Sequence, residues 1–151
     1  MNYITTDINV ITHHLKKLDE NSAPLWGSMS VQRMIEHLTD SINLATSDHS
    51  FKLTVPEDKI DKVQGFLASE HPLPREFKVE FANPKIPIRN HNIVEAINEL
   101  EEAWGKFKSY FDANPDIKTL HPSFGHLGYD QWLRLHSKHI THHLQQFGID
   151  V

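Results

Sequence analysis

The stretch Gln131 to Phe147, which reads QWLRLHSKHITHHLQQF, decides the expected fold. A helix turns by about 100° per residue, so apolar residues three, four and seven positions apart gather on one side of it. In this stretch that side carries Leu133, Ile140, Leu144 and Phe147. The spacing predicts a helix over Tyr129 to Phe147, with Gly148 placed to end it in the left-handed conformation.

Histidine is frequent in the chain, with 12 residues among 151, and several of them fall on this helix. His139 and His143 are four positions apart, which makes them neighbours on a helix surface. They could therefore direct two imidazole rings at one metal ion. The pairs His136/His139 and His139/His142 are also allowed by spacing, so spacing alone does not choose the ligands.

Three more helices are predicted upstream. Their apolar residues recur at helical spacing, and Asp7 and Ser30 are suitable N-terminal caps. These helices are expected over residues 7–18, 30–46 and 92–113. Four helices with apolar faces predict an all-α four-helix bundle, and a chain of 151 residues fits one domain over residues 1–151.

The segment 47–89, between the second and third predicted helices, is rich in proline. It holds five of the eight prolines, Pro56, Pro72, Pro74, Pro84 and Pro87. Proline lacks a backbone donor, so long regular elements are not expected there. One short helix over 56–68 and an extended piece over 77–81 fit the pattern, and 116–127 is expected to be a loop. Long irregular segments in a small domain often cover a site.

A metal site needs a third ligand, and His37 is the best candidate because it is the only histidine of the second predicted helix. Three neutral imidazoles suit zinc or nickel, and also iron(II) or copper, and leave coordination positions open. Gln146 and His136 lie one turn away from the pair on the fourth helix. We expect them to support the ligands or to contact substrate, with His136 as the candidate catalytic residue. His121 and His126, in the loop before that helix, are weaker candidates to face the site.

Composition excludes several classes of function. Lys and Arg total 15 and Asp and Glu total 20, a net charge of −5, so nucleic acid is not expected as a partner. No run approaches about 20 consecutive apolar residues and no targeting segment is visible, so we expect no membrane association and a cytoplasmic location. The absence of cysteine excludes thiolate ligands and a cysteine nucleophile.

Two blocks of sequence resemble the DinB-like superfamily. The first is Trp26-Gly27-Ser28-Met29-Ser30 followed by His37. The second is HPSFGHL at 121–127, then Gln131-Trp132 and HHLQQFG at 142–148. The second block resembles a branch of small uncharacterised bacterial proteins in that superfamily, while residues 47–89 match it only loosely.

The resemblance implies a four-helix bundle that holds a divalent metal through three histidines, which by position are His37, His139 and His143. The glutamine three residues after the last ligand corresponds to Gln146. Gly128 departs from the pattern, because relatives often carry a capping Thr or Ser there.

Some DinB-like proteins are metal-dependent transferases that use a low-molecular-weight thiol, and the resemblance implies such an enzyme with a small-molecule substrate. A chain without cysteine must take any such thiol from solution. The alternatives are a metal-dependent hydrolase and a non-enzymatic metal-binding or stress-associated bundle. Proteins of this superfamily often form homodimers, which is a further expectation.

Overall fold

The computed structural model describes residues 2–47, 51–75 and 86–151. The extended piece expected over 77–81 lies outside these residues. The described part is mostly helical, as expected, and it also contains a small antiparallel sheet. Its elements are α1 (Ile8–Leu15), α2 (Val31–Leu44), η1 (Glu57–Lys59), α3 (Ile60–Ala68), α4 (Ile93–Ala113), β1 (Thr119–His121), β2 (Gly125–Leu127) and α5 (Tyr129–Gln146).

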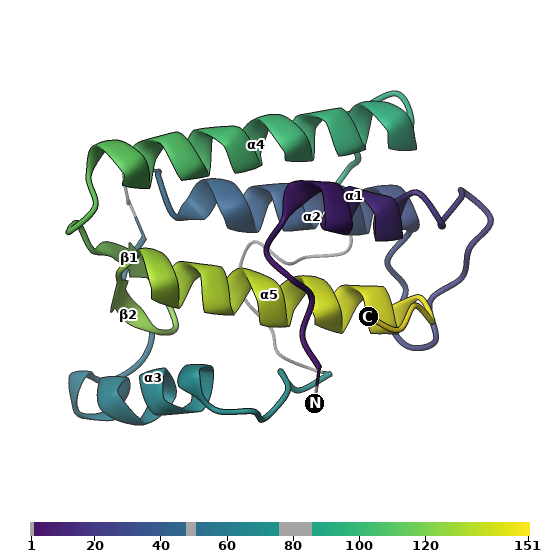
Figure 1. Ribbon diagram of the computed structural model, residues 1–151. Helices are drawn as coiled ribbons and strands as arrows, with labels where there is room; N and C mark the ends of the chain where they lie inside the picture. Colours follow the sequence, from purple (N-terminus) through teal and green to yellow (C-terminus); the bar gives the residue numbers. More distant parts are fainter. Residues whose placement is uncertain (1, 48–50, 76–85) are drawn as a thin grey trace.

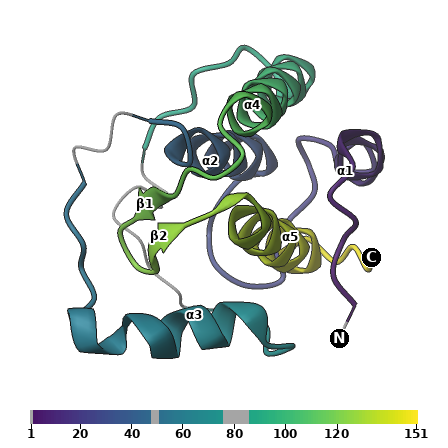
Figure 2. The same ribbon diagram turned by 60° about the vertical axis from the view of Figure 1, so that its left-hand side comes forward.

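Each of the α-helices contributes buried residues to a common hydrophobic core. Figure 2 shows α1, α2, α4 and α5 nearly end-on, with α3 on the outside beside α5. The main contact of α2 is with α4, and α5 runs alongside α2 (Figure 1). Phe107 of α4 together with Trp132 and Leu144 of α5 is fully buried in this core. The arrangement brings the face of α2 that carries His37 toward α5.

The helix starts follow the capping residues. The Asp7 side chain accepts a hydrogen bond from the Asn9 amide at 2.8 Å, and Ser30 Oγ accepts one from the Arg33 amide at 3.1 Å. These bonds satisfy backbone donors that have no partner within the helix. The predicted starts of α1 and α2 are therefore confirmed, while both helices end two or three residues earlier than predicted.

The expected loop over 116–127 is wrong in part, because it folds as a β-hairpin. β1 pairs antiparallel with β2, with Leu120 opposite His126. Gly125 adopts the left-handed conformation at φ +77° directly after the turn. Strands of three residues are too short to show an alternating pattern, which is why the sequence did not reveal them.

The proline-rich segment contains the short helix predicted over 56–68, as η1 and α3. α3 packs on the outer side of α5. Among the described residues, no helix is both long enough and apolar enough to cross a membrane.

Candidate metal centre

Three histidines from two helices meet between α2 and α5. Nε2 of His139 lies 2.9 Å from Nε2 of His37 and 3.0 Å from Nε2 of His143. One ligand atom from each ring lies within 4.8 Å of those of the other two, so the group could hold a metal ion. Among the pairs that spacing allows on α5, the structure therefore brings His139 and His143, and neither His136 nor His142, to His37.

A hydrogen-bond relay fixes the orientation of His143. Gln146 Nε2 donates to the Trp26 carbonyl oxygen at 3.0 Å, and Gln146 Oε1 lies 2.8 Å from His143 Nδ1. Because a carbonyl can only accept, the amide nitrogen of Gln146 must face Trp26 and its oxygen must face His143. His143 Nδ1 must then carry the proton, which leaves the lone pair on Nε2 directed at the other two histidines.

Gly27 makes this relay possible. It has a left-handed backbone at φ +75°, and a Cβ atom at this position would lie 3.1 Å from Gln146 Nε2. A larger residue would be strained and would push on the Gln146 amide. The Trp26-Gly27 sequence thus places a carbonyl against the end of α5.

Hydrogen bonds between the three rings satisfy their Nε2 atoms poorly, whereas a metal ion can bind all three. His139 Nε2 is close to two other Nε2 atoms, and a single proton on it could serve only one of them in good geometry. A divalent ion would accept all three lone pairs. In a tetrahedral zinc site with Zn–N bonds of about 2.0–2.1 Å, neighbouring nitrogens are roughly 3.3 Å apart, so the rings need to separate by only a few tenths of an ångström.

The electrostatics of the site keep the rings neutral. Burial lowers the pKa of His37 to about 4, and the positive charge of Arg33 adds to this effect. Burial also lowers the pKa values of His139 and His143 well below the usual range, and the neighbouring histidines reinforce the shift. Neutral imidazole is the form that binds a metal ion.

Arg33 is a charged neighbour that the sequence reasoning missed. Its side chain is 2% exposed, and its nearest carboxylates are Glu36 at 3.9 Å and Asp40 at 3.5 Å. Nε and Nη1 of Arg33 have no hydrogen-bond partner in the described part of the chain. The sequence could have indicated this neighbour, because Arg33 precedes His37 by one turn of α2. The Glu36 and Asp40 carboxylates compensate the charge of this buried guanidinium.

The three histidines are largely enclosed by the protein. His37 and His143 are buried, and His139 is intermediate in exposure. Within the described residues, no carboxylate joins the three histidines. The chain therefore offers three ligands, and a closed structural zinc site normally has four.

His136 lies apart from the three-histidine group. Its ring is buried against Trp104, Phe107 and Trp132 at centroid distances of 5.0–6.0 Å. Burial lowers its pKa to about 3. Its Nε2 atom has no hydrogen-bond partner among the described residues. The predicted catalytic role of His136 stays a prediction.

The two loop histidines have different positions. His121 is buried in the hairpin against Phe124 and Trp132, and His126 is exposed on β2. Neither belongs to the three-histidine group.

Comparison with known families gives one informative match. The model of a family described as "Protein of unknown function (DUF1569)" matches residues 67–149, which is more than half of the chain. The match includes α4, the hairpin and α5, and hence His139, His143 and Gln146, but not α2 with His37. Comparisons with curated proteins and with solved structures gave no significant match.

Proposed function

The chain belongs to the family described as proteins of unknown function (DUF1569), and from its site we propose that it is a metal-dependent enzyme. In this proposal His37, His139 and His143 hold one divalent ion and leave a position open for a small exogenous ligand. The observation that carries the proposal is the convergence of three Nε2 atoms, with the His143 lone pair fixed by Gln146.

An ion held in this way would lower the pKa of a bound thiol or water and so supply a nucleophile near neutral pH. Three neutral ligands would leave the positive charge of the ion uncompensated. An uncompensated positive charge favours an anionic partner such as a thiolate. Three imidazoles suit zinc or nickel first, and also iron or copper.

The low-molecular-weight thiol is supported by the DinB-like resemblance together with the absence of cysteine. A hydrolase that uses water is the alternative within the same site. His136 is the candidate catalytic residue of this proposal, and its enclosed ring packs against Trp104 and Phe107.

Metal content of protein purified without a histidine tag tests the ligand set. His37→Ala, His139→Ala and His143→Ala should each lose most of the bound metal. His142→Ala is the matched control, because it removes an imidazole from the same helix without removing a proposed ligand. Loss of metal in His142→Ala with retention in His143→Ala would contradict the assignment.

Cobalt-substituted protein separates the two chemistries. Sulfur ligation to cobalt gives a strong charge-transfer band in the near ultraviolet, so small thiols should produce this band in the wild type. His139→Ala should lose it together with the metal. If millimolar thiol leaves the spectrum unchanged, the thiol transferase loses its main support, and the hydrolase and the non-enzymatic metal-binding protein are then favoured over it.

A further inference from the structure

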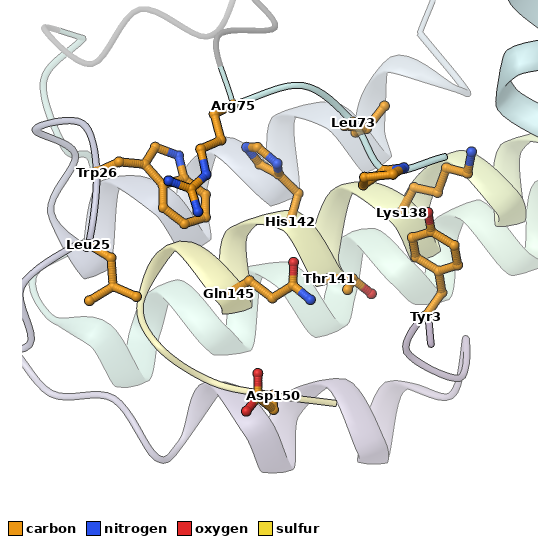
Figure 3. Close-up of a pocket in the computed structure, with 11 residues that line it drawn as sticks. Tyr3, Leu25, Trp26, Leu73, Arg75, Lys138, Thr141, His142, Gln145 and Asp150 are labelled. Carbon is orange, nitrogen blue, oxygen red and sulfur yellow. The ribbon is translucent and has the colours of Figure 1, made fainter. Parts of the chain in front are cut away.

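A pocket of about 380 Å³ lies beside the candidate metal centre. It is formed by the N-terminal segment, the loop before α2, residues 72–75 and one face of α5 (Figure 3). Its size falls in the range of small-molecule sites. None of the three proposed metal ligands lines it, so the pocket can be considered separately from the metal.

Arg75 and Trp26 form one end of the pocket. The Arg75 guanidinium lies 4.1 Å from the centre of the Trp26 ring system, and Figure 3 shows the two side chains stacked. In the described part of the chain, no carboxylate forms an ion pair with Arg75. Stacking holds the planar guanidinium in place and leaves its edge available for a bidentate contact with a carboxylate.

The Trp26 indole supplies a second unused donor. Its Nε1 atom is buried and has no hydrogen-bond acceptor among the described residues. A buried N–H group without an acceptor costs roughly 1–3 kcal/mol, so most such groups have a partner. The indole N–H and the guanidinium at the same end of the pocket both lack an acceptor.

Lys138 brings a second positive charge to the pocket. Its side chain is 1% exposed, and Nζ donates to the carbonyl oxygens of Phe66 and His71 at 3.0 and 2.8 Å. Both partners are neutral, and an ammonium group has three protons. Lys138 thus adds positive charge to the lining, and its Nζ also lies 4.9 Å from the centre of the Phe66 ring. Asp150, the acidic residue of the lining, lies on the side away from Arg75 and Lys138 in Figure 3.

We propose that this pocket binds a small organic carboxylate with a planar or apolar body. The carboxylate lies at the Arg75 guanidinium, which is stacked on the Trp26 ring, and the body lies against the aromatic and aliphatic walls, which include Tyr3 and Leu73. The two cations outnumber the one acid, so the pocket discriminates against neutral and cationic compounds of the same shape.

The pocket and the candidate metal centre share a wall. The His142 ring lines the pocket and lies 5.0 Å from the His143 ring, measured between centroids. Trp26 also lines the pocket, and its carbonyl holds Gln146. None of the proposed metal ligands lines the pocket, however. Carboxylate binding in this pocket therefore does not depend on the proposed metal.

Phenylacetate is a suitable probe, with phenylacetamide as its uncharged match. The indole N–H signal of Trp26 in a nitrogen–proton NMR spectrum, assigned with Trp26→Phe, reports directly from the pocket. Titration of metal-free protein with phenylacetate should shift this signal more than those of Trp104 and Trp132. Phenylacetamide should bind at least about tenfold more weakly, because it lacks the charge.

Arg75→Gln should weaken phenylacetate binding about tenfold, and Arg75→Lys should weaken it less. The control is Lys106→Gln, which removes the same charge from an exposed position outside the pocket and should leave the affinity unchanged. Equal binding of acid and amide, or an unchanged affinity in Arg75→Gln, would overturn the proposal. The phenylacetate titration uses metal-free protein, so its outcome does not depend on the metal ligands. Loss of metal in the histidine variants tests only the proposed metal site.

Discussion

At the scale of single residues, the candidate site depends on Gln146 as well as on the histidines. Gln146 contacts no ion in the proposed arrangement, yet its two amide atoms join the Trp26 carbonyl to His143 Nδ1. A ligand histidine whose second nitrogen is held in this way keeps one tautomer and one ring orientation. The residue that sets the direction of the lone pair therefore contributes to metal affinity without being a ligand.

Gln146→Ala should lower the zinc affinity by about 10–100-fold, the usual effect of removing a partner that holds a ligand histidine. The physical reason is that His143 loses its acceptor and can adopt the other tautomer. Competition titration with a chromophoric chelator measures the change. Gln145→Ala is the matched control, because the neighbouring Gln145 lines the pocket instead of contacting His143, and it should bind zinc like the wild type. An unchanged affinity in Gln146→Ala would show that the relay does not support the site.

At the scale of elements, α5 carries most of the site, and its first turn has no side-chain cap from the N-cap residue. Gly128 precedes it in an extended conformation, φ −81° and ψ 178°, and its amide donates to Gln131 Oε1 at 3.0 Å. Glycine offers no side-chain acceptor to the first turn. The backbone conformation suits any residue, and an added Cβ would find only Lys118 Cγ, at 3.9 Å.

Gly128→Ser should therefore stabilise the protein by about 0.5–1 kcal/mol. The serine hydroxyl can accept from the first turn of α5, and the unfolded chain loses the freedom of glycine. Urea unfolding of metal-free protein measures the free energy of unfolding. Gly128→Ala separates the two contributions, because it restricts the unfolded chain without adding a cap, and it should gain less than serine. A serine variant no more stable than the alanine variant would argue against capping.

Helix starts were predictable because capping is local. Asp7 and Ser30 cap α1 and α2 as the sequence indicated, and Gly148 ends α5 with φ +77°. The hairpin was not predictable from periodicity, since its pairing depends on Gly125 and on contacts with distant segments. Spacing alone did not choose among the histidine pairs of α5, whereas the family resemblance of the sequence selected His139 and His143 with His37. The packing of α5 against α2 brings these same three side chains together.

At the scale of the whole molecule, the hairpin connects parts that are far apart in the sequence. Thr119 Oγ1 donates to the Ala45 carbonyl at 2.7 Å and accepts from Trp132 Nε1 at 2.8 Å. Gln64 Nε2 of α3 donates to the Phe124 carbonyl at 2.9 Å. The hairpin thus joins the end of α2, the proline-rich segment and the start of α5. Loss of its structure would release all three.

His121 makes this connection sensitive to acid. Its Nδ1 atom accepts a hydrogen bond from the Ser123 amide at 3.0 Å, which requires the neutral ring. Burial lowers its pKa from 6.5 to about 4. Between these values the unfolded chain binds a proton that the folded chain does not, so stability is full above about pH 6.5 and falls as the pH drops toward about 4. One such group accounts for about 3 kcal/mol over this range.

His121→Asn should reduce this acid sensitivity while keeping the fold. Asparagine Oδ1 replaces Nδ1 as the acceptor for the Ser123 amide and does not titrate in this range. In metal-free protein, the free energy of unfolding should fall less steeply between pH 7 and pH 4.5 in this variant than in the wild type. The difference in slope should correspond to the uptake of about one proton on unfolding. Other buried histidines, including His136, maintain the remaining slope. His126→Asn is the control, because that histidine is exposed on the same hairpin, and its pH profile should match the wild type. If His121→Asn and wild-type protein lose stability in parallel on acidification, His121 is not the group that couples the hairpin to pH.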